Sequence, residues 1–248
     1  MLFDAGFEIG QALVQHRRIA AVGFTGSRRG GTALMDLAAR RQVPIPVYAE
    51  MSSINPIVIL PELLNSEPAA TAKTLAGSMT MGVGQFCTNP GLILVVGDGT
   101  EFESELTSLV SQTAKGCFLT PDIEAAYHAG VSTLGSQPGV HSLHSVPAAS
   151  LFAVSAHDFV GNEKLQAEVF GPCSLVVRCQ NARQAEEVIR SLEGQLTASV
   201  FGTSDEIASF DTLFGELELI AGRVIVNQVP TGLEVCHSTV HGGPYPAT

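Results

Sequence analysis

The stretch Ile19-Ala-Ala-Val-Gly-Phe-Thr-Gly-Ser-Arg-Arg-Gly-Gly31 joins a short apolar run to a turn of small residues. An uninterrupted apolar run suits a strand that is buried on both faces, as the strands of parallel sheets are. The turn at residues 25–27 ends this strand and caps a helix that we expect at about residues 29–41. An extended segment with two prolines follows at 43–48, where it suits an edge strand. This stretch therefore predicts a β-α-β unit.

The same alternation of apolar runs and helical periodicity continues along the chain, which indicates an α/β fold with a mostly parallel sheet flanked by helices. Residues 131–149 are rich in Ser, Gly, Pro and His, so we expect a loop or an irregular strand there. Strands are expected at 57–60, 92–96, 150–154, 173–178, 196–201 and 223–227, and helices at about 4–16, 66–82, 101–115, 121–129, 182–192 and 205–217.

Composition excludes several classes of protein. The 248 residues are 45% hydrophobic and 15% charged with a net charge of -11, which indicates a globular chain and disfavours nucleic acid as a partner. No apolar run approaches the roughly 20 residues that span a bilayer, and the start does not resemble a secretory signal. We expect a soluble, cytoplasmic protein without a membrane partner. The five cysteines lack a CxxC motif, so neither a disulfide framework nor a zinc ribbon is predicted.

The turn at Gly26 and Ser27 is the first candidate site. Small residues that open a helix direct backbone N–H groups and the positive helix end towards an anion such as a nucleotide phosphate. The Ser27 hydroxyl would add a further contact. The pattern does not match GxGxxG, so an ordinary turn between a strand and a helix is the alternative.

Cys87 and Glu50 are the second and third candidates. Cys87 lies in Met81-Gly-Val-Gly-Gln-Phe-Cys-Thr-Asn-Pro90, a loop of glycines and polar side chains in which a thiolate nucleophile is plausible. Glu50 ends an apolar extended segment, where a carboxylate suits a general base. The alternatives are a packed thiol and a solvated carboxylate, which are the commoner fates of these residue types.

Glu168 and Phe170 form the fourth candidate, before the Gly-Pro turn in Ala167-Glu-Val-Phe-Gly-Pro172. Glu168 could bind ribose hydroxyls and Phe170 could flank a flat ring, although a surface turn with one anchoring aromatic explains the pattern equally well. His237 and His241 have i, i+4 spacing, but the surrounding Gly and Pro argue against the helix that a two-histidine metal site needs. We therefore predict no metal.

These segments, in this order, resemble the aldehyde dehydrogenase superfamily over nearly the whole chain. The matching motifs are Phe-Thr-Gly-Ser at 24–27, Glu50, Gly84-Gln-Phe-Cys87, Glu168-Val-Phe-Gly-Pro172 and Gly-Arg-Val-Ile-Val-Asn at 222–227. Ala49-Glu-Met-Ser-Ser-Ile-Asn-Pro56 and Gly84-Gln-Phe-Cys-Thr-Asn-Pro-Gly91 are similar to the α-ketoglutaric semialdehyde (2,5-dioxovalerate) dehydrogenase branch. Most relatives carry Leu-Gly-Gly-Lys after the Glu instead.

The resemblance implies oxidation of an aldehyde to a carboxylate with NAD or NADP. Cys87 would form a thiohemiacetal and then a thioester, with the oxyanion held by backbone N–H groups and an amide side chain, and Glu50 would activate the hydrolytic water. Gly26 and Ser27 would contact phosphate, Glu168 a ribose, and Phe170 the nicotinamide ribose. The full-length form would be a homo-oligomer.

The resemblance also implies a division of the chain. Residues 1–49 would be the last βαβ portion of a Rossmann-like cofactor domain, 50–230 the catalytic domain and 231–248 a tail. Full members are longer upstream, so we expect little or no turnover from these 248 residues alone. The alternatives are a non-catalytic structural or interaction module that retains the fold, and a dehydrogenase of another semialdehyde or an aliphatic aldehyde. The choice between NAD and NADP stays open.

Overall fold

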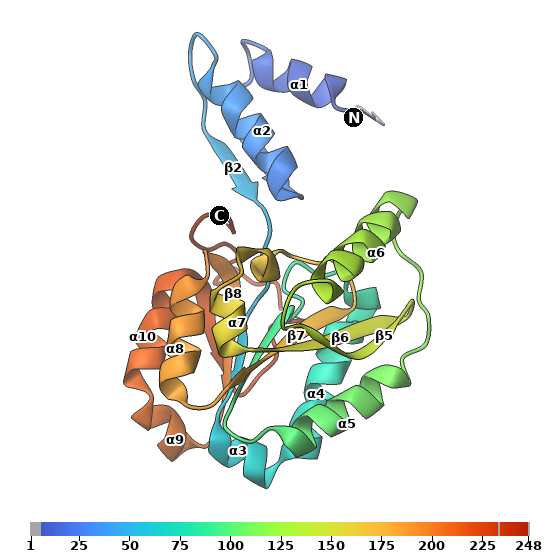
Figure 1. Ribbon diagram of the computed structural model, residues 1–248. Coiled ribbons are helices and arrows are strands. Elements are labelled where there is room, and N and C mark those ends of the chain that lie inside the picture. The colour runs from blue at the N-terminus through green and yellow to red at the C-terminus, as the bar shows by residue number, and fades with distance from the viewer. Residues whose placement is uncertain (1–5, 233, 248) are drawn as a thin grey trace.

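The computed structural model describes residues 6–232 and 234–247, and it contains two sheets (Figure 1). The smaller sheet pairs β1 with β2 in parallel, with Thr25 opposite Glu50. The β-α-β unit predicted from the sequence is therefore present. Its elements are α1 (Glu8–Gln15), β1 (Val22–Thr25), α2 (Arg28–Ala39) and β2 (Val47–Glu50). The helix expected at about 4–16 begins in residues that lie outside the described part of the chain.

The larger sheet has seven strands in the order β5-β6-β7-β4-β3-β8-β9. All neighbouring pairs are parallel except β5 and β6, which are antiparallel. The α/β fold with a mostly parallel sheet is thus confirmed. The strands are β3 (Ile57–Ile59), β4 (Leu92–Val96), β5 (His141–Val146), β6 (Ala149–Ser155), β7 (Cys173–Cys179), β8 (Gln195–Phe201) and β9 (Ala221–Val226).

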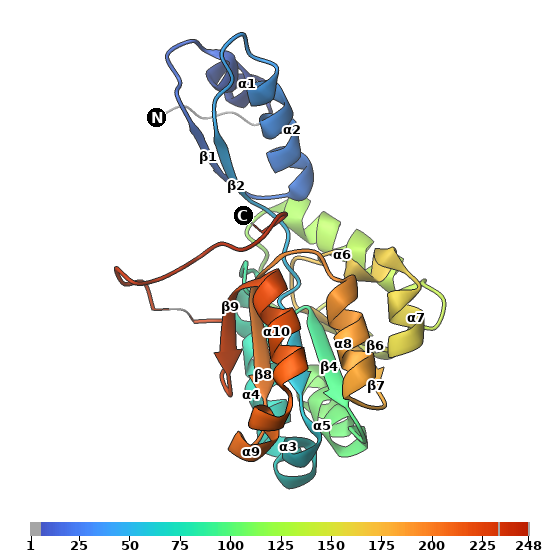
Figure 2. The same cartoon turned by 90° about the vertical axis from the view of Figure 1, so that its left-hand side faces the viewer.

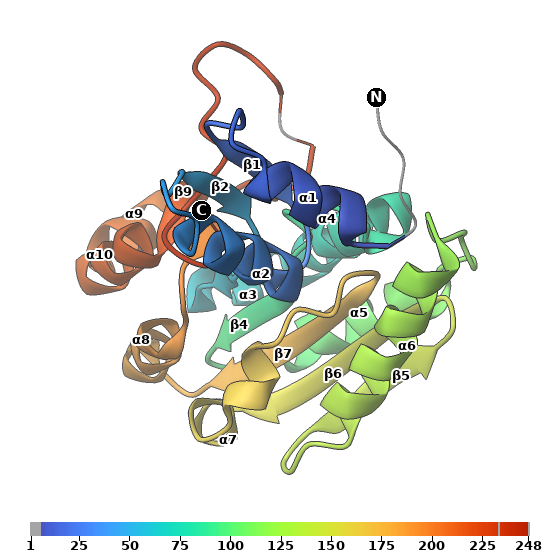
Figure 3. The ribbon, with the colours of Figure 1, turned by 90° about the horizontal axis from the view of Figure 1, so that it is seen from above.

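Helices cover both faces of this sheet, and Figures 2 and 3 show α8 and α10 on the side opposite α4 and α5. Each face buries its own apolar cluster, as expected when parallel strands are apolar on both sides. None of the helices in the described residues is long and apolar enough to cross a bilayer. The helices are α3 (Pro61–Ser66), α4 (Pro68–Thr80), α5 (Thr100–Ser111), α6 (Pro121–Gly135), α7 (Ala156–Val160), α8 (Ala182–Ser191), α9 (Ser204–Ser209) and α10 (Asp211–Ile220), with 3-10 turns η1 (Met81–Gly84) and η2 (Glu163–Gln166).

Three expected elements differ from those observed. The helix expected at 66–82 is α4, which Pro68 opens, and a short helix that the sequence did not predict, α3, precedes it with non-helical Glu67 between the two. The helix expected at 205–217 is divided at Phe210. Within 131–149, α6 continues to Gly135 and an edge strand, β5, follows with an irregularity in its pairing.

The order of the sheet explains why distant motifs meet. The segments with Glu168, Cys87 and Glu50 directly precede β7, β4 and β3, and Gln195 is the first residue of β8. Because β7, β4, β3 and β8 are adjacent and parallel, these segments lie together at the amino-terminal ends of these strands. The carboxyl ends of β1 and β2 in the small sheet point towards the same end of the larger sheet (Figure 2).

Backbone contact joins two of these segments. Gly84 has φ 61°, and a Cβ at this position would overlap the Gly171 carbonyl and the Pro172 nitrogen. Gly171 is similarly confined, because a Cβ there would overlap the Tyr127 ring. Only glycine permits this approach at Gly84, so the Cys87 loop can lie directly against the residues before β7.

Gly84→Ala should therefore lower the free energy of unfolding by about 2–4 kcal/mol, because it adds both the left-handed backbone cost and the overlap with Gly171. Gly77→Ala is the matched control: Gly77 is in the interior of α4 with nothing within 4 Å of an added Cβ, so this variant should gain about 0.5–1 kcal/mol. Urea unfolding measures both. Equal stabilities would show that the loop does not depend on this contact.

Candidate active site

Glu50 is the last residue of β2, and its backbone is tied to the predicted phosphate turn. The Gly26 N–H donates to the Glu50 carbonyl oxygen at 3.0 Å, one step beyond the pairing of Thr25 with Glu50. The register of the small sheet therefore sets the distance between the turn at Gly26 and the carboxylate of Glu50.

The loop that carries Cys87 has unusual backbone geometry. Gly82, Val83 and Gly84 all have positive φ, at 54°, 61° and 61°. Such a conformation is costly for valine and needs support from its surroundings. The chain consequently turns sharply after the end of α4 and places Cys87 close to the amino-terminal end of β4.

The side-chain amide of Asn55 stabilises the Cys87 loop by hydrogen bonds to its backbone. Its Nδ2 donates to the carbonyl oxygens of Cys87 at 2.9 Å and Asn89 at 3.0 Å. Its Oδ1 accepts from the hydroxyls of Ser53 and Thr197, both at 2.9 Å. Asn55 is buried and has φ 46°, a conformation that asparagine tolerates better than most residues. Its amide therefore attaches the loop to the residues before β3 and to β8.

Gln85 holds the same loop from the other side. Its Oε1 accepts from the Leu119 N–H at 2.8 Å, and its Nε2 donates to the carbonyls of Gly82 and Cys117 at 3.2 and 3.3 Å. Both N–H bonds of its amide are thus used within the protein. Gln85 therefore has a structural role in this loop.

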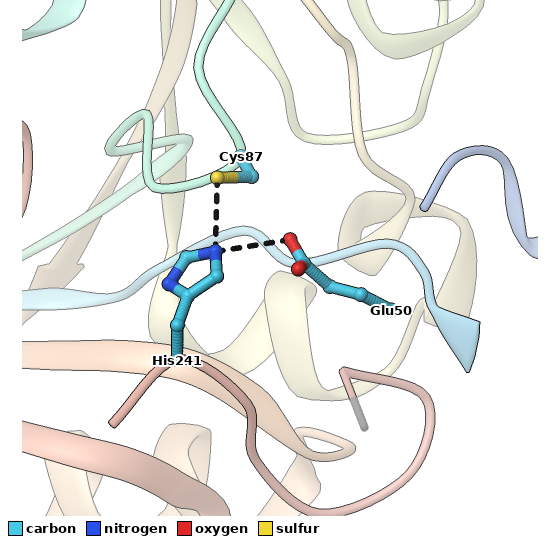
Figure 4. A group of neighbouring side chains, drawn as sticks. All are labelled: Glu50, Cys87 and His241. Atoms are coloured by element: carbon cyan, nitrogen blue, oxygen red, sulfur yellow. Dashed lines mark hydrogen bonds and ion pairs between the residues drawn. The ribbon is translucent and has the colours of Figure 1, made fainter. Parts of the chain in front are cut away.

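Three polar side chains meet at the amino-terminal end of the large sheet: those of Cys87, Glu50 and His241 (Figure 4). The Cys87 sulfur lies 3.3 Å from His241 Nε2, which in turn lies 3.2 Å from Glu50 Oε1. All three atoms are within 4.8 Å of one another. The structure thus brings together the predicted nucleophile and the predicted base. The same ring nitrogen faces both groups, so an Nε2 proton can be shared between sulfur and carboxylate but cannot be relayed across the ring.

The position of His241 depends on close backbone contacts of the tail. The Gly194 N–H donates to the Tyr245 carbonyl at 3.1 Å, and a Cβ at Gly222 would overlap the Gly242 carbonyl. The tail therefore lies against the starts of β8 and β9, below the small sheet (Figure 1). Sequence reasoning considered His241 only as a metal ligand paired with His237 and missed this placement, because no local spacing signals it.

The thiols differ in pKa because their surroundings differ. Partial burial, followed by the charge of Glu50, raises the pKa of Cys87, while the backbone N–H groups of Cys87 and Thr88 oppose the change. Burial raises the pKa of Cys173 and Cys179 to about 12. Hydroxyl hydrogen bonds from Ser238, then from Thr239, lower the pKa of the exposed Cys236 to about 7. The strongest intrinsic thiol acid is therefore outside the cluster.

Ser27 acts as the N-cap of α2, where its Oγ accepts from the Gly30 N–H at 3.2 Å. The next residue, Arg28, forms a paired hydrogen bond with Glu193, including one of 2.8 Å, and lies 5.5 Å from the centre of the Tyr245 ring. The turn is thus a genuine helix N-terminus of a 12-residue helix, and Arg28 connects it to the larger sheet and the tail.

Glu168 lines a cavity of about 240 Å³ together with Arg28, Ser52 and Gln195. Burial raises the pKa of Glu168 to about 7, against the hydrogen bonds from the Ser53 N–H and the Ser52 hydroxyl, and the Glu50 charge adds to the increase. Phe170 is 37% exposed, beside this region in sequence and not part of the cavity lining. The structure therefore places the α2 N-terminus and Glu168 around one cavity.

Glu50→Gln in a Cys236→Ser background should speed alkylation of Cys87 at about pH 8 by roughly three- to tenfold, because loss of the neighbouring negative charge lowers the thiol pKa and increases the thiolate fraction. Peptide mapping after iodoacetamide treatment measures the rate at each cysteine. Buried Cys173 and Cys179 should react only after unfolding and serve as internal controls. An unchanged or slower rate at Cys87 would contradict the proposed electrostatic coupling.

Glu168→Gln should stabilise the protein in a pH-dependent manner. The folded chain retains the Glu168 proton up to a pH of about 7, whereas the unfolded chain loses it near the ordinary pKa of 4.5, so this group lowers stability as the pH rises between those values. The stability gained by the variant should therefore be larger at about pH 8 than at about pH 4.5. Urea midpoints at the two pH values test this, and a constant difference would refute it.

Comparison with known proteins connects this geometry to a family. The sequence model of the aldehyde dehydrogenase family matches residues 1–127. α-Ketoglutaric semialdehyde dehydrogenase 2 of Azospirillum brasilense is 45% identical over 259 residues, an alignment that covers 100% of this chain and 49% of the relative. α-Ketoglutaric semialdehyde dehydrogenase of Acinetobacter baylyi is 38% identical and is covered to 48%. The chain thus spans about half the length of these curated relatives.

Solved structures agree on the fold. The crystal structure of 1-pyrroline-5-carboxylate dehydrogenase from Thermus with bound NAD superposes with a TM-score of 0.79 at 19% identity, covering 96% of this chain and 48% of that one. γ-Glutamyl-γ-aminobutyraldehyde dehydrogenase from Burkholderia cenocepacia gives a TM-score of 0.74 at 21% identity, covering 90% and 47%. With the family match over half of the chain and the predicted motifs in one site, the chain belongs to the aldehyde dehydrogenase family.

Proposed function

We propose that this chain carries the nucleophile and the base of an NAD(P)-dependent aldehyde dehydrogenase that acts on α-ketoglutaric semialdehyde. The single observation that carries the proposal is the convergence of Cys87 Sγ and Glu50 Oε1 within 4.8 Å. The two curated relatives described above are named for this substrate, and their similarity supports the same choice here. Another semialdehyde or an aliphatic aldehyde is the runner-up substrate.

Cys87 acts as the nucleophile. Its sulfur adds to the aldehyde carbon, and the carbonyl oxygen becomes the oxyanion of a thiohemiacetal. The backbone N–H groups of Cys87 and Thr88 lie on the sulfur side of this site and favour negative charge there. A proton on His241 Nε2, 3.3 Å from the sulfur, stabilises the thiolate before attack.

Glu50 acts in the second half of the reaction. Once the acyl group is held on Cys87 as a thioester, Glu50 removes a proton from the attacking water, and the carboxylic acid leaves as the thiol is released. His241 lies 3.2 Å from Glu50 and orients its carboxylate. The raised pKa of Cys87 disfavours release of a thiolate, so the proton that Glu50 takes from the water passes to the sulfur, which leaves as the thiol.

The cavity beside Glu168 fits part of a dinucleotide. The N-terminus of α2 would offer N–H groups and the Ser27 hydroxyl to phosphate, and Glu168, which lines the cavity, would bind a ribose. Phe170 lies outside the cavity lining, and its proposed place beside the nicotinamide ribose rests on the family resemblance. A Cβ at Gly26 would lie 2.9 Å from the end of the Phe24 ring, so a larger residue there would displace that ring. When bound, NAD or NADP supplies the hydride acceptor.

We assign residues 1–49 to the cofactor-binding part, 50–230 to the catalytic part and 231–248 to a tail that contributes His241. The five cysteines are free, as is usual in a reducing compartment, and this supports a cytoplasmic location. Association of copies of the chain through the sheet edges at β5 or β9 would complete the assembly expected from the family.

Hydrolysis of an activated ester tests these roles without the cofactor, because an ester acylates Cys87 directly and reaches the same thioester. The chain should hydrolyse p-nitrophenyl acetate, and Cys87→Ala should abolish the reaction. Glu50→Gln should slow deacylation by about 10²-fold or more, so that the acyl-enzyme accumulates and is visible by mass spectrometry.

Cys236→Ser is the matched control, because Cys236 is an exposed thiol with a lowered pKa that lies in no cluster with acidic or histidine side chains among the described residues. This variant should retain the ester hydrolysis that depends on Cys87. If acylation follows Cys236, or if Glu50→Gln leaves deacylation unchanged, the proposed roles are wrong. A non-catalytic module that retains the fold would then be the better description.

A further inference from the structure

Three metal-binding atoms of different chemistry face one point in the site. They are the Cys87 sulfur, His241 Nε2 and Glu50 Oε1, all within 4.8 Å of one another (Figure 4). Among the described residues, these three form the group of His, Cys, Asp and Glu side chains that is close enough to hold an ion. They come from a loop, a tail and a strand end, so the tertiary structure assembles the set.

Two of the three distances between the ligand atoms match those around a tetrahedral zinc ion. Zinc lies about 2.3 Å from sulfur, about 2.0–2.1 Å from an imidazole nitrogen and about 2.0–2.2 Å from a carboxylate oxygen. Tetrahedral angles then separate sulfur from nitrogen by about 3.6 Å, nitrogen from oxygen by about 3.3 Å and sulfur from oxygen by about 3.6 Å. The observed sulfur–nitrogen and nitrogen–oxygen separations are 3.3 Å and 3.2 Å, and the sulfur and oxygen lie within 4.8 Å, so metal binding requires the carboxylate and the thiol to approach each other by about 1 Å at most.

The bonding within the cluster is poorly balanced without a cation. A single ring nitrogen faces both the sulfur and the carboxylate, and it has at most one proton to share between them. An ionised Cys87 and an ionised Glu50 would place two negative charges within 4.8 Å of each other. A divalent cation would accept a lone pair from all three atoms and neutralise both negative charges.

The surroundings permit binding and release. The side chains of His241 and Glu50 are 31% and 17% exposed, so an ion can enter from solvent. The Asn55 amide donates to the Cys87 carbonyl oxygen, and the Gly26 N–H donates to the Glu50 carbonyl oxygen. These hydrogen bonds restrain the backbone of two of the three ligands. Three protein ligands leave the fourth tetrahedral position for water.

We propose that Cys87, His241 and Glu50 form a reversible Zn²⁺ site. Binding releases the thiol proton to solvent and converts the sulfur to a zinc thiolate. The mixed sulfur, nitrogen and oxygen ligands select zinc over Mg²⁺, which prefers oxygen alone. That the bound ion blocks acyl transfer, because it occupies both the nucleophile and the base, rests on the proposed function; the binding itself does not.

Calorimetric titration of the reduced 248-residue chain with Zn²⁺ tests the site. We expect one ion per chain, no heat of binding with Mg²⁺, and at least a tenfold weaker zinc affinity in each of His241→Ala, Cys87→Ser and Glu50→Gln. Co²⁺ should give a cobalt–thiolate charge-transfer band that is lost in Cys87→Ser. Zn²⁺ should also protect Cys87 from iodoacetamide in the unsubstituted chain and fail to do so in His241→Ala.

His237→Ala and Cys236→Ser are matched controls, because both residues are exposed in the same tail and lie outside the cluster. Both variants should bind zinc as the unsubstituted chain does. Circular dichroism verifies that each variant is folded, and His241→Gln replaces His241→Ala if the latter is not. Absence of one-to-one binding, or binding that depends on Cys236 and not on His241, would overturn the proposal.

Ester hydrolysis in the presence of a chelator separates the two proposals. Hydrolysis that depends on Cys87, together with failure to bind zinc, would refute the metal site and leave the proposed function intact. Zinc binding through the three residues without any ester hydrolysis would support the metal site and refute the proposed function. Hydrolysis that zinc suppresses, with recovery on chelation, supports both.

Discussion

The buried amide of Asn55 is the interaction on which the site depends. One side chain holds the carbonyls of Cys87 and Asn89 and accepts hydrogen bonds from Ser53 and Thr197. Leaving such groups unpaired in the interior costs about 1–3 kcal/mol each, so these hydrogen bonds stabilise the observed conformation of the Cys87 loop. Gln195 extends the network, because its Oε1 accepts from the Ile54 and Asn55 N–H groups at 2.8 and 3.1 Å.

Glycines complete what the polar network begins. Gly84 allows the Cys87 loop to touch the backbone before β7, and Gly222 allows the tail to touch the backbone at the start of β9. At each point two backbones approach more closely than any side chain would allow. Cys87 and His241 are therefore positioned by main-chain contacts, which are stiffer than contacts between long side chains.

The groups around Cys87 act on the ionisation of its thiol in opposite directions. Burial and Glu50 both disfavour the Cys87 thiolate, whereas the backbone N–H groups of Cys87 and Thr88, and an N–H at His241 Nε2, favour it. A site with this balance holds its nucleophile as a thiol until substrate, or a cation, changes the surroundings. The same arrangement is consistent with both the proposed acyl transfer and the proposed zinc site.

The α/β class, the β-α-β unit and most strand positions could be predicted from the amino-acid sequence, because apolar runs and helical periodicity are local properties of the chain. Motif order also predicted Cys87, Glu50, Gly26, Ser27, Glu168 and Phe170 as site residues. Only the tertiary structure decided which of these meet: the strand order β7-β4-β3-β8 brings together segments that are more than 100 residues apart. His241 became visible only there, since its place depends on backbone contacts of the tail that leave no periodic signal.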